Sequence, residues 1–283
     1  MKLGIVTPVV TRLPGAHARW EADAGIAEIE RVVLEAERLG YHHATCSEHV
    51  AVPVEVTRTR GGTYWDPLAV FGYLAARTTT IRFATFVLVL GYHHPLELVK
   101  RYGTLDTVSG GRLILGVGVG SLAEEFALLG AEFATRGDRA DDAIRALRAS
   151  FGRDEPEYHG THYDFADVLV RPAGVQMPPP IWVGGRTARS LRRAVELGDG
   201  WAPFGLPVAQ IATMLAGSSP REVLLQPDAP LDPASDPDAT RREVALLQDA
   251  GATMLNLRFV HHSVDHYCEQ LAAMRAIVRD ETV

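Results

Sequence analysis

An acidic residue and a histidine stand side by side where a short apolar run ends. The run Ala44-Thr-Cys-Ser47 is followed directly by Glu48 and His49. Histidine changes its charge near neutral pH more readily than other side chains, so His49 could donate a proton to a substrate or accept one from it. A loop histidine that is merely hydrogen-bonded is the alternative interpretation. At the end of a barrel strand, such a residue is well placed for catalysis.

Three alternating glycines end a second apolar run, Leu113-Ile-Leu-Gly-Val-Gly-Val-Gly120. From Gly118 to Ala123 the residues satisfy the dinucleotide-binding pattern G-x-G-x-x-A, which calls for an acidic residue about 20 positions further on, at the end of the next strand. Asp138 has that spacing but begins a helical run instead. We therefore favour the interpretation that these glycines let a cofactor ring approach the strand end, because no Cβ intervenes.

A second glycine loop lies in Ile181-Trp-Val-Gly-Gly-Arg-Thr187. Gly184 and Gly185 end a short strand, and Thr187 is a suitable N-cap for a helix that begins nearby. Backbone N–H groups at a helix N-terminus, next to Arg186, form a site for an anion such as the phosphate of a cofactor. A plain tight turn with a solvated Arg186 is the alternative.

The remaining histidines and the cysteines predict no metal site. Adjacent histidines on a strand should point to opposite sides, and His262 and His266 lack the Glu-x-x-His context of a zinc helix; the adjacent pairs are His42-His43, His93-His94 and His261-His262. The two cysteines lie far apart without metal or redox spacing, which favours a reducing compartment. The sequence also lacks a Gly-x-Ser-x-Gly elbow and a P-loop.

The elements that must position these residues alternate between strand-like and helix-like patterns. Parallel strands joined by right-handed helical crossovers are expected from such alternation, and 283 residues suit an α/β protein of the (β/α)₈ TIM-barrel type. An open doubly wound sheet is the rival. The expected strands are Leu3–Thr7, Ala44–Ser47, Ile81–Leu90, Leu113–Val117, Ile181–Val183, Gly200–Ala202, Glu222–Gln226 and Thr253–Phe259.

Two stretches interrupt this rhythm. Residues 153–175 lack helical periodicity and predict an insertion after the fourth strand and helix, and residues 217–238 are rich in Pro, Asp and Ser. Neither stretch divides the chain, so residues 1–283 are expected to form a single domain.

Composition excludes several classes of function. The net charge of −7 argues against a nucleic-acid or anionic-membrane partner, and the 47% of apolar residues suits a globular protein with a sizeable core. The first apolar run stops at Pro8, too early for a signal peptide, and no apolar stretch is long enough to span a membrane. We expect a cytoplasmic protein that acts on a small molecule.

Several segments together resemble one known family, the luciferase-like monooxygenase superfamily, and especially its branch of F420-dependent oxidoreductases. The resemblance runs from Met1 to about Phe204 and fades afterwards. The matching segments are 36–49 (AERLGYHHATCSEH), 65–68 (WDPL), 105–113 (LDTVSGGRL), 116–120 (GVGVG), 124–126 (EEF), 136–139 (RGDR), 179–185 (PPIWVGG) and 198–201 (GDGW).

The resemblance implies a (β/α)₈ barrel that binds coenzyme F420, or alternatively FMN, in its mouth. The residue that matches His49 often lies beside the reactive ring in relatives, and the cofactor phosphate is held after the segment matching residues 182–186. A non-prolyl cis peptide is implied at Phe86-Val87, and dimers are common among relatives, so a homodimer is expected. The implied cofactor-binding residues are Glu48, Thr85, Phe86, Val87, Val119, Gly120, Ser121, Gly184, Gly185 and Arg186.

One departure from the family concerns Ser121. Relatives that oxidise sugar phosphates have a glutamate at this position, and serine cannot replace it, so a sugar-phosphate substrate is not expected. The leading hypothesis is hydride transfer between F420 and an organic substrate, with His49 as the catalytic residue that moves a proton. The alternatives are an FMN-dependent monooxygenase and a non-enzymatic protein that binds a flavin or deazaflavin.

Overall fold

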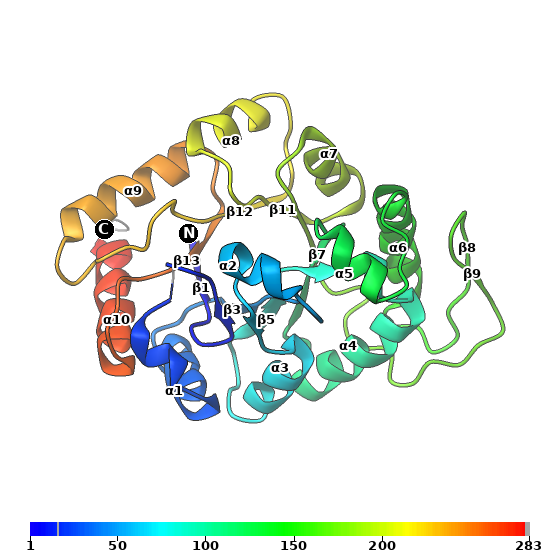
Figure 1. The fold of residues 1–283 in the computed structure, drawn as a ribbon, viewed down its shortest axis with the longest axis horizontal. Helices are drawn as coiled ribbons and strands as arrows, with labels where there is room; N and C mark the ends of the chain where they lie inside the picture. The colour runs from blue at the N-terminus through cyan, green and yellow to red at the C-terminus, as the bar shows by residue number, and fades with distance from the viewer. Residues whose placement is uncertain (16, 281–283) are drawn as a thin grey trace.

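Eight parallel strands close into a barrel in the computed structural model, which describes residues 1–15 and 17–280 (Figure 1). The ring closes because β10 pairs with both β7 and β11, while β1 pairs with both β3 and β13. The expected (β/α)₈ barrel is therefore confirmed, and the open sheet is excluded. The barrel strands are β1 (Lys2–Val6), β3 (His43–Cys46), β5 (Arg82–Thr85), β7 (Leu113–Gly118), β10 (Ile181–Gly184), β11 (Gly200–Ala202), β12 (Glu222–Leu225) and β13 (Met254–Leu257).

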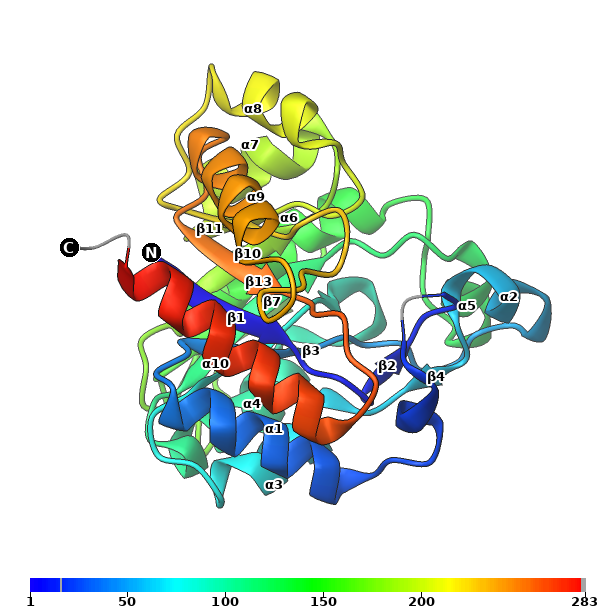
Figure 2. The ribbon, with the colours of Figure 1, turned by 90° about the vertical axis from the view of Figure 1, so that its left-hand side faces the viewer.

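A helix follows each barrel strand and packs on the outside of the ring (Figures 1 and 2). In α1, for example, Ile29, Val32, Val33 and Ala36 recur at helical spacing and are buried against the sheet. The outer helices are α1 (Ile26–Arg38), α3 (Pro67–Ala75), α4 (Pro95–Ser109), α6 (Arg136–Ser150), α7 (Ala188–Leu197), α8 (Val208–Leu215), α9 (Pro237–Asp249) and α10 (Val264–Asp280).

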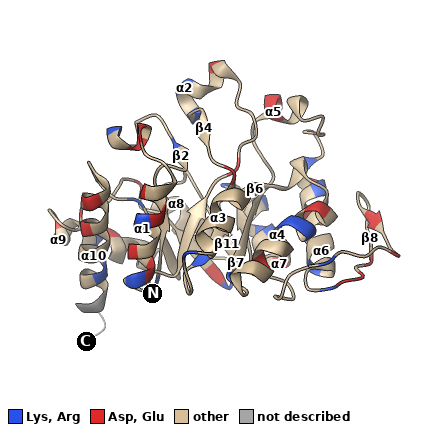
Figure 3. Cartoon of the chain, turned by 90° about the horizontal axis from the view of Figure 1, so that it is seen from below, with Lys and Arg blue, Asp and Glu red and all other residues tan. Residues whose placement is uncertain are grey.

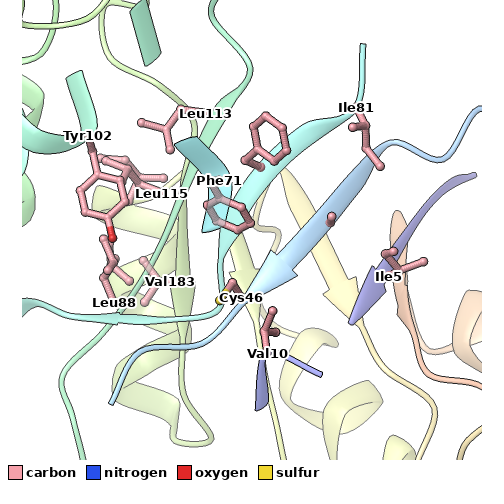
Figure 4. Close-up of a cluster of buried hydrophobic side chains, with 14 of the residues drawn as sticks. Ile5, Val10, Cys46, Phe71, Ile81, Leu88, Tyr102, Leu113, Leu115 and Val183 are labelled. Atoms are coloured by element: carbon pink, nitrogen blue, oxygen red, sulfur yellow. The ribbon is translucent and has the colours of Figure 1, made fainter. Parts of the chain in front are cut away.

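The core has two layers because side chains alternate along each strand. The outer layer lies between strands and helices, and Figure 4 shows some of its side chains, among them Ile5 of β1, Phe71 of α3 and Leu113 of β7. The inner layer fills the barrel with one residue from each of six strands, namely Ala84, Ile114, Trp182, Ala202, Leu224 and Met254.

Two adjacent histidines lie at the amino end of the barrel. The Nδ1 atoms of His42 and His43 are 3.0 Å apart, and the His43 ring packs edge-on against Trp182. The expectation that adjacent histidines point to opposite sides is therefore wrong for this pair, because His42 precedes β3 and is not part of the strand.

The third strand is interrupted where the sequence predicts continuous strand from Ile81 to Leu90. β5 ends at Thr85, the peptide between Phe86 and Val87 is cis, and β6 (Leu88–Val89) pairs with β7 before a 3₁₀ turn, η3 (Leu90–Tyr92). The cis peptide that the family resemblance implied is thus present. Residues 85–87, from the end of β5 through the cis peptide, lie at the carboxyl end of the barrel and are termed the bulge.

Small additional elements gather on the carboxyl-end side of the barrel (Figures 2 and 3). They are the β2–β4 pair (Thr11–Arg12 and Thr63–Tyr64), η1 (Arg19–Ala22), η2 (Val54–Val56), α2 (Thr57–Arg60) and α5 (Ala123–Leu128). The expected insertion after α6 holds a separate hairpin, β8 (Tyr158–His159) with β9 (Asp164–Phe165), at the edge of the molecule. No helix among residues 1–15 and 17–280 is long and apolar enough to cross a membrane.

Candidate active site

The predicted site residues come together at the carboxyl ends of the strands, the mouth of the barrel. β3 ends at Cys46, three residues before His49; β7 ends at Gly118, and β10 ends at Gly184. Since these strands are parallel in one closed sheet, their carboxyl ends face the same side. Glycine loops and histidine therefore border one region.

His49 is held by a carboxylate that the sequence did not pair with it. Its Nδ1 atom lies 2.6 Å from Oε2 of Glu125, which lies on α5 after β7. The ring also packs edge-on against Tyr64, with centroids 4.5 Å apart. Nε2 of His49 makes no hydrogen bond to a described residue, and the side chain is 17% exposed. One ring nitrogen is thus bound by a carboxylate of the protein, and the other has no partner among the described residues.

Glu125 is a buried carboxylate with several donors around it. Its side chain is fully buried, and Oε1 accepts hydrogen bonds from the backbone N–H groups of Val50 at 2.6 Å and Ala51 at 3.0 Å. Oε2 accepts a further bond from the Tyr92 hydroxyl at 2.9 Å. Burial acts to raise the pKa of Glu125, but the bonds from Ala51, His49 and Tyr92 outweigh it and lower that pKa. Glu125 is therefore an anion at neutral pH, which favours Nδ1–H on His49.

The segment from Val50 to Tyr64 passes over the mouth and carries α2 (Figures 1 and 2). Its first residues are bound by Glu125, and its last packs on His49. Between them, Arg60 Nη1 donates to Ser121 Oγ at 2.9 Å. Ser121 thus binds the segment above the mouth through Arg60, and its side chain is exposed.

Glu48 turns away from His49 despite being its neighbour in sequence. Its Oε2 accepts the backbone N–H of Val89 at 2.8 Å, and its Oε1 lies 2.7 Å from His93 Nε2. Burial acts to lower the pKa of His93, but Glu48 outweighs it and raises that pKa. Glu48 therefore connects the loop after β3 to β6 and to His93, and it makes no hydrogen bond to His49.

Val87, in the bulge, accounts for the glycines at positions 118 and 184 better than an approaching cofactor does. A Cβ on Gly118 would lie 2.6 Å from Val87 Cγ2, and one on Gly184 would lie 2.7 Å from Val87 Cγ1. Real Cβ atoms do not come this close, so Val87 occupies the space that the glycines leave. The missing Cβ of Gly118 was expected to make room for a cofactor ring. In the structure, the side chain of Val87 fills that space instead.

The other predicted residues of the bulge and the first glycine loop lie at or just after the ends of β5 and β7. Thr85 donates from Oγ1 to the Gly116 carbonyl at 2.7 Å, and Phe86 packs against the inner core. Val119 is partly buried, and Gly120 has φ +77°, a conformation that favours glycine.

The second glycine loop leads into α7, as predicted. Thr187 is the N-cap, with Oγ1 accepting the Ser190 N–H at 3.2 Å, and Gly185 has φ +132°. Arg186 is exposed and forms no ion pair with a described residue. A helix N-terminus beside an unpaired arginine has the donors that a phosphate group requires. The residues present therefore fit the phosphate end of a flavin-type cofactor.

Sequence reasoning missed the partners of His49. Glu125 and Tyr64 contact His49, Tyr92 bonds Glu125, and all three come from other segments of the chain. Of these segments, Glu124-Glu-Phe126 matched the family in sequence, and that match gave it no role. No group of three or more His, Cys, Asp or Glu side chains in the described part of the chain could hold a metal ion.

The family is established by comparison with known proteins. The model of the luciferase-like monooxygenases matches residues 1–219, so this chain belongs to the luciferase-like monooxygenase family. An uncharacterized protein of Mycobacterium tuberculosis is 35% identical over 182 residues, which cover 60% of this chain and 62% of that protein's length. The match thus spans less than two thirds of this relative.

Solved structures share the fold at low identity. An F420-dependent secondary alcohol dehydrogenase in complex with an F420-acetone adduct superimposes with a TM-score of 0.71 at 13% identity, over 96% of this chain and 98% of the other. The oxygenating constituent of 3,6-diketocamphane monooxygenase from Pseudomonas putida, in complex with FMN, gives 0.74 at 16%, over 99% and 98%. The likenesses show a common fold; the neighbours use different cofactors.

Proposed function

We propose that this chain is an oxidoreductase that transfers a hydride between coenzyme F420 and a small organic substrate, with His49 moving the accompanying proton. One observation carries the proposal: Glu125 holds Nδ1 of His49 and leaves Nε2 without a protein partner at the mouth. Membership in a family with F420-dependent and flavin-dependent structural neighbours supports it.

Different residues of the mouth would bind the cofactor and transfer the proton. The N-terminus of α7 and Arg186 would hold the phosphate end of the cofactor, and the bulge of residues 85–87 would border its ring. When bound, F420 supplies the centre that donates or accepts a hydride. With Nδ1–H donated to Glu125, Nε2 of His49 carries a lone pair that accepts a proton from a substrate hydroxyl, or returns it to a carbonyl in the reverse direction.

The cover over the mouth serves the same reaction. The segment with α2, held by Glu125 and by the Arg60–Ser121 hydrogen bond, limits the access of water to the region of His49. Exclusion of water strengthens the electrostatic interactions of His49 with a substrate and prevents loss of the hydride to solvent.

Cofactor titration of the purified protein tests the proposal. We expect F420 to bind at lower concentration than FMN, as followed by quenching of cofactor fluorescence. His49→Ala should leave the F420 dissociation constant within about twofold while reducing turnover by roughly 100-fold or more, the usual contribution of a general acid–base group. Glu124→Gln, at an exposed neighbouring site, is the control for both measurements.

A second candidate is an FMN-dependent monooxygenase, which the structural likeness to the FMN-bound camphane enzyme favours. Tighter binding of FMN than of F420, together with oxygen consumption when a flavin reductase is added, would support this candidate and contradict the first. If a bound cofactor were neither oxidised nor reduced with any substrate tried, this result would support a non-enzymatic role in cofactor binding.

A further inference from the structure

Arg258 follows directly after β13, the last strand of the barrel, on the side of the mouth. Its neighbours Leu257 and Phe259 both belong to the outer core, and the β-bridge between Leu231 and Phe259 keeps the chain extended beyond β13. Side chains alternate along such a chain, so Arg258 projects to the same side as Asn256. Asn256 lies inside the barrel, where its Nδ2 donates to Thr45 Oγ1 of β3 at 3.3 Å.

The guanidinium of Arg258 lacks an anionic partner. No carboxylate oxygen of the described residues lies within 4.0 Å of it, and the protein offers it one long hydrogen bond, from Nη2 to the Asp228 carbonyl at 3.3 Å. Its Nε is buried without any hydrogen-bond partner. Burial lowers the pKa of Arg258, and the charge of Asp228 opposes this effect. A half-buried cation with unused donors is costly unless an anion completes its contacts.

Arg193 shows one way in which this protein satisfies a buried guanidinium. Arg193 has a side chain that is 5% exposed; it pairs with the Asp141 carboxylate and also donates to the Gly137 carbonyl at 3.0 Å. Arg258 has no such carboxylate, and its Nη1 makes no hydrogen bond to a described residue.

We propose that Arg258 binds an oxyanion of the substrate, a carboxylate or a phosphate group, on the β13 side of the mouth. Two strands, β11 and β12, separate β13 from β10, so this position is distinct from the cofactor-phosphate position at α7. The planar guanidinium fork matches the paired oxygens of either group. The proposal rests on the proposed function in treating the mouth as the substrate site, and it narrows the substrate to an organic anion.

Calorimetric binding of inorganic phosphate and of acetate, at constant ionic strength and without cofactor, tests the proposal. Four proteins are compared: the unaltered chain, Arg258→Met, Arg258→Lys and the control Arg242→Met, which removes an equal charge from the exposed face of α9. We expect Arg258→Met to weaken binding of at least one probe about tenfold or more, as loss of a hydrogen bond to a charged group should. Arg258→Lys should weaken it less, and Arg242→Met should leave it unchanged. The tighter probe indicates which oxyanion the substrate carries.

Several results would contradict an oxyanion site at Arg258. If Arg258→Met bound both probes as tightly as the unaltered chain, or if neither probe bound saturably to the unaltered chain, the proposal would be overturned. A fifth protein, Arg186→Met, identifies phosphate that is bound at α7. Loss of binding in this variant alone would also contradict a site at Arg258. If Arg258→Met fails to fold, the comparison rests on Arg258→Lys, which keeps the charge but not the fork. F420 and FMN titrations are separate measurements, so the proposed cofactor can fail while the anion site stands.

Discussion

Nδ1 of His49 lies 2.6 Å from Oε2 of Glu125, although 76 residues separate them in the chain. The contact joins the loop after β3 to the short helix after β7, two strand ends that the barrel brings to the same side. Glu125 also binds the first backbone N–H groups of the segment above the mouth. One carboxylate thus orients the proposed proton-transfer group and fixes the cover of the site.

Removing this carboxylate should destabilise the protein. Glu125→Ala leaves His49, Tyr92 and two backbone N–H groups without their acceptor, and we expect a loss of about 3 kcal/mol in the free energy of unfolding, measured with urea. Glu124→Ala, one residue earlier and exposed, should cost under about 0.5 kcal/mol. Equal losses in the two variants would show that Glu125 is not the anchor described here.

The packing of Val87 over the glycines gives a second prediction. Gly184→Ala introduces a Cβ 2.7 Å from Val87 Cγ1 and should destabilise the protein by about 1–3 kcal/mol. Adding Val87→Ala should recover part of that loss, which a double-mutant cycle measures. Gly72→Ala in α3, where an added Cβ meets nothing within 4 Å, should be neutral or stabilising by up to about 1 kcal/mol. A Gly184→Ala variant as stable as Gly72→Ala would contradict the close packing.

Low pH should lower the stability of the folded protein through a histidine at the amino end of the barrel. Burial, aided by the charges of Lys2 and Arg82 and opposed by Glu222, lowers the pKa of His42 to about 4. The unfolded chain binds this proton near pH 6.5, whereas the folded protein does not until about pH 4. The contribution of His42 to stability is therefore complete above pH 6.5 and is lost as the pH falls toward 4.

Urea unfolding at pH 7 and pH 5 measures this effect. The unaltered protein should lose more stability between these two values than His42→Gln, whose side chain does not titrate. His17→Gln, at an exposed position, should behave like the unaltered protein. An identical loss in His42→Gln would mean that His42 is not responsible for the acid sensitivity.

Arg112 should prove essential for joining α3 to β5. Its guanidinium is buried and makes four hydrogen bonds to the turn between these elements, to Ala75 O, Thr78 O, Thr78 Oγ1 and Ile81 O. Arg112→Met leaves three buried carbonyl groups without this donor, and we expect a loss of about 3 kcal/mol by urea unfolding. Arg192→Met on the exposed face of α7 should cost under about 0.5 kcal/mol. A similarly small loss for Arg112→Met would show that water replaces these bonds.

The sequence predicted the strands and helices because their signals are local. Apolar runs such as Leu113–Val117 and helical spacing such as Ile29, Val33 and Ala36 reflect burial of one face, which does not depend on which strand is the neighbour. Thr187 as an N-cap is equally local, since the cap and the N–H group it accepts are three residues apart. The same periodicity could not show the break after Thr85, because Ile81–Leu90 is apolar on both sides of the cis peptide; only the family resemblance indicated it.

The sequence by itself determined the alternation of strands and helices, the loops that carry the glycines, and the presence of His49 at a strand end. Only the tertiary structure decided that the sheet closes, that Glu125 rather than Glu48 is the partner of His49, and that Val87 fills the space above Gly118 and Gly184. The direction of Arg258 and its lack of a carboxylate partner also depend on the tertiary structure, through the extended chain after β13 and the groups packed around it. The physical reason is common to all of these: they depend on distances between residues far apart in the chain, and barrel closure sets those distances.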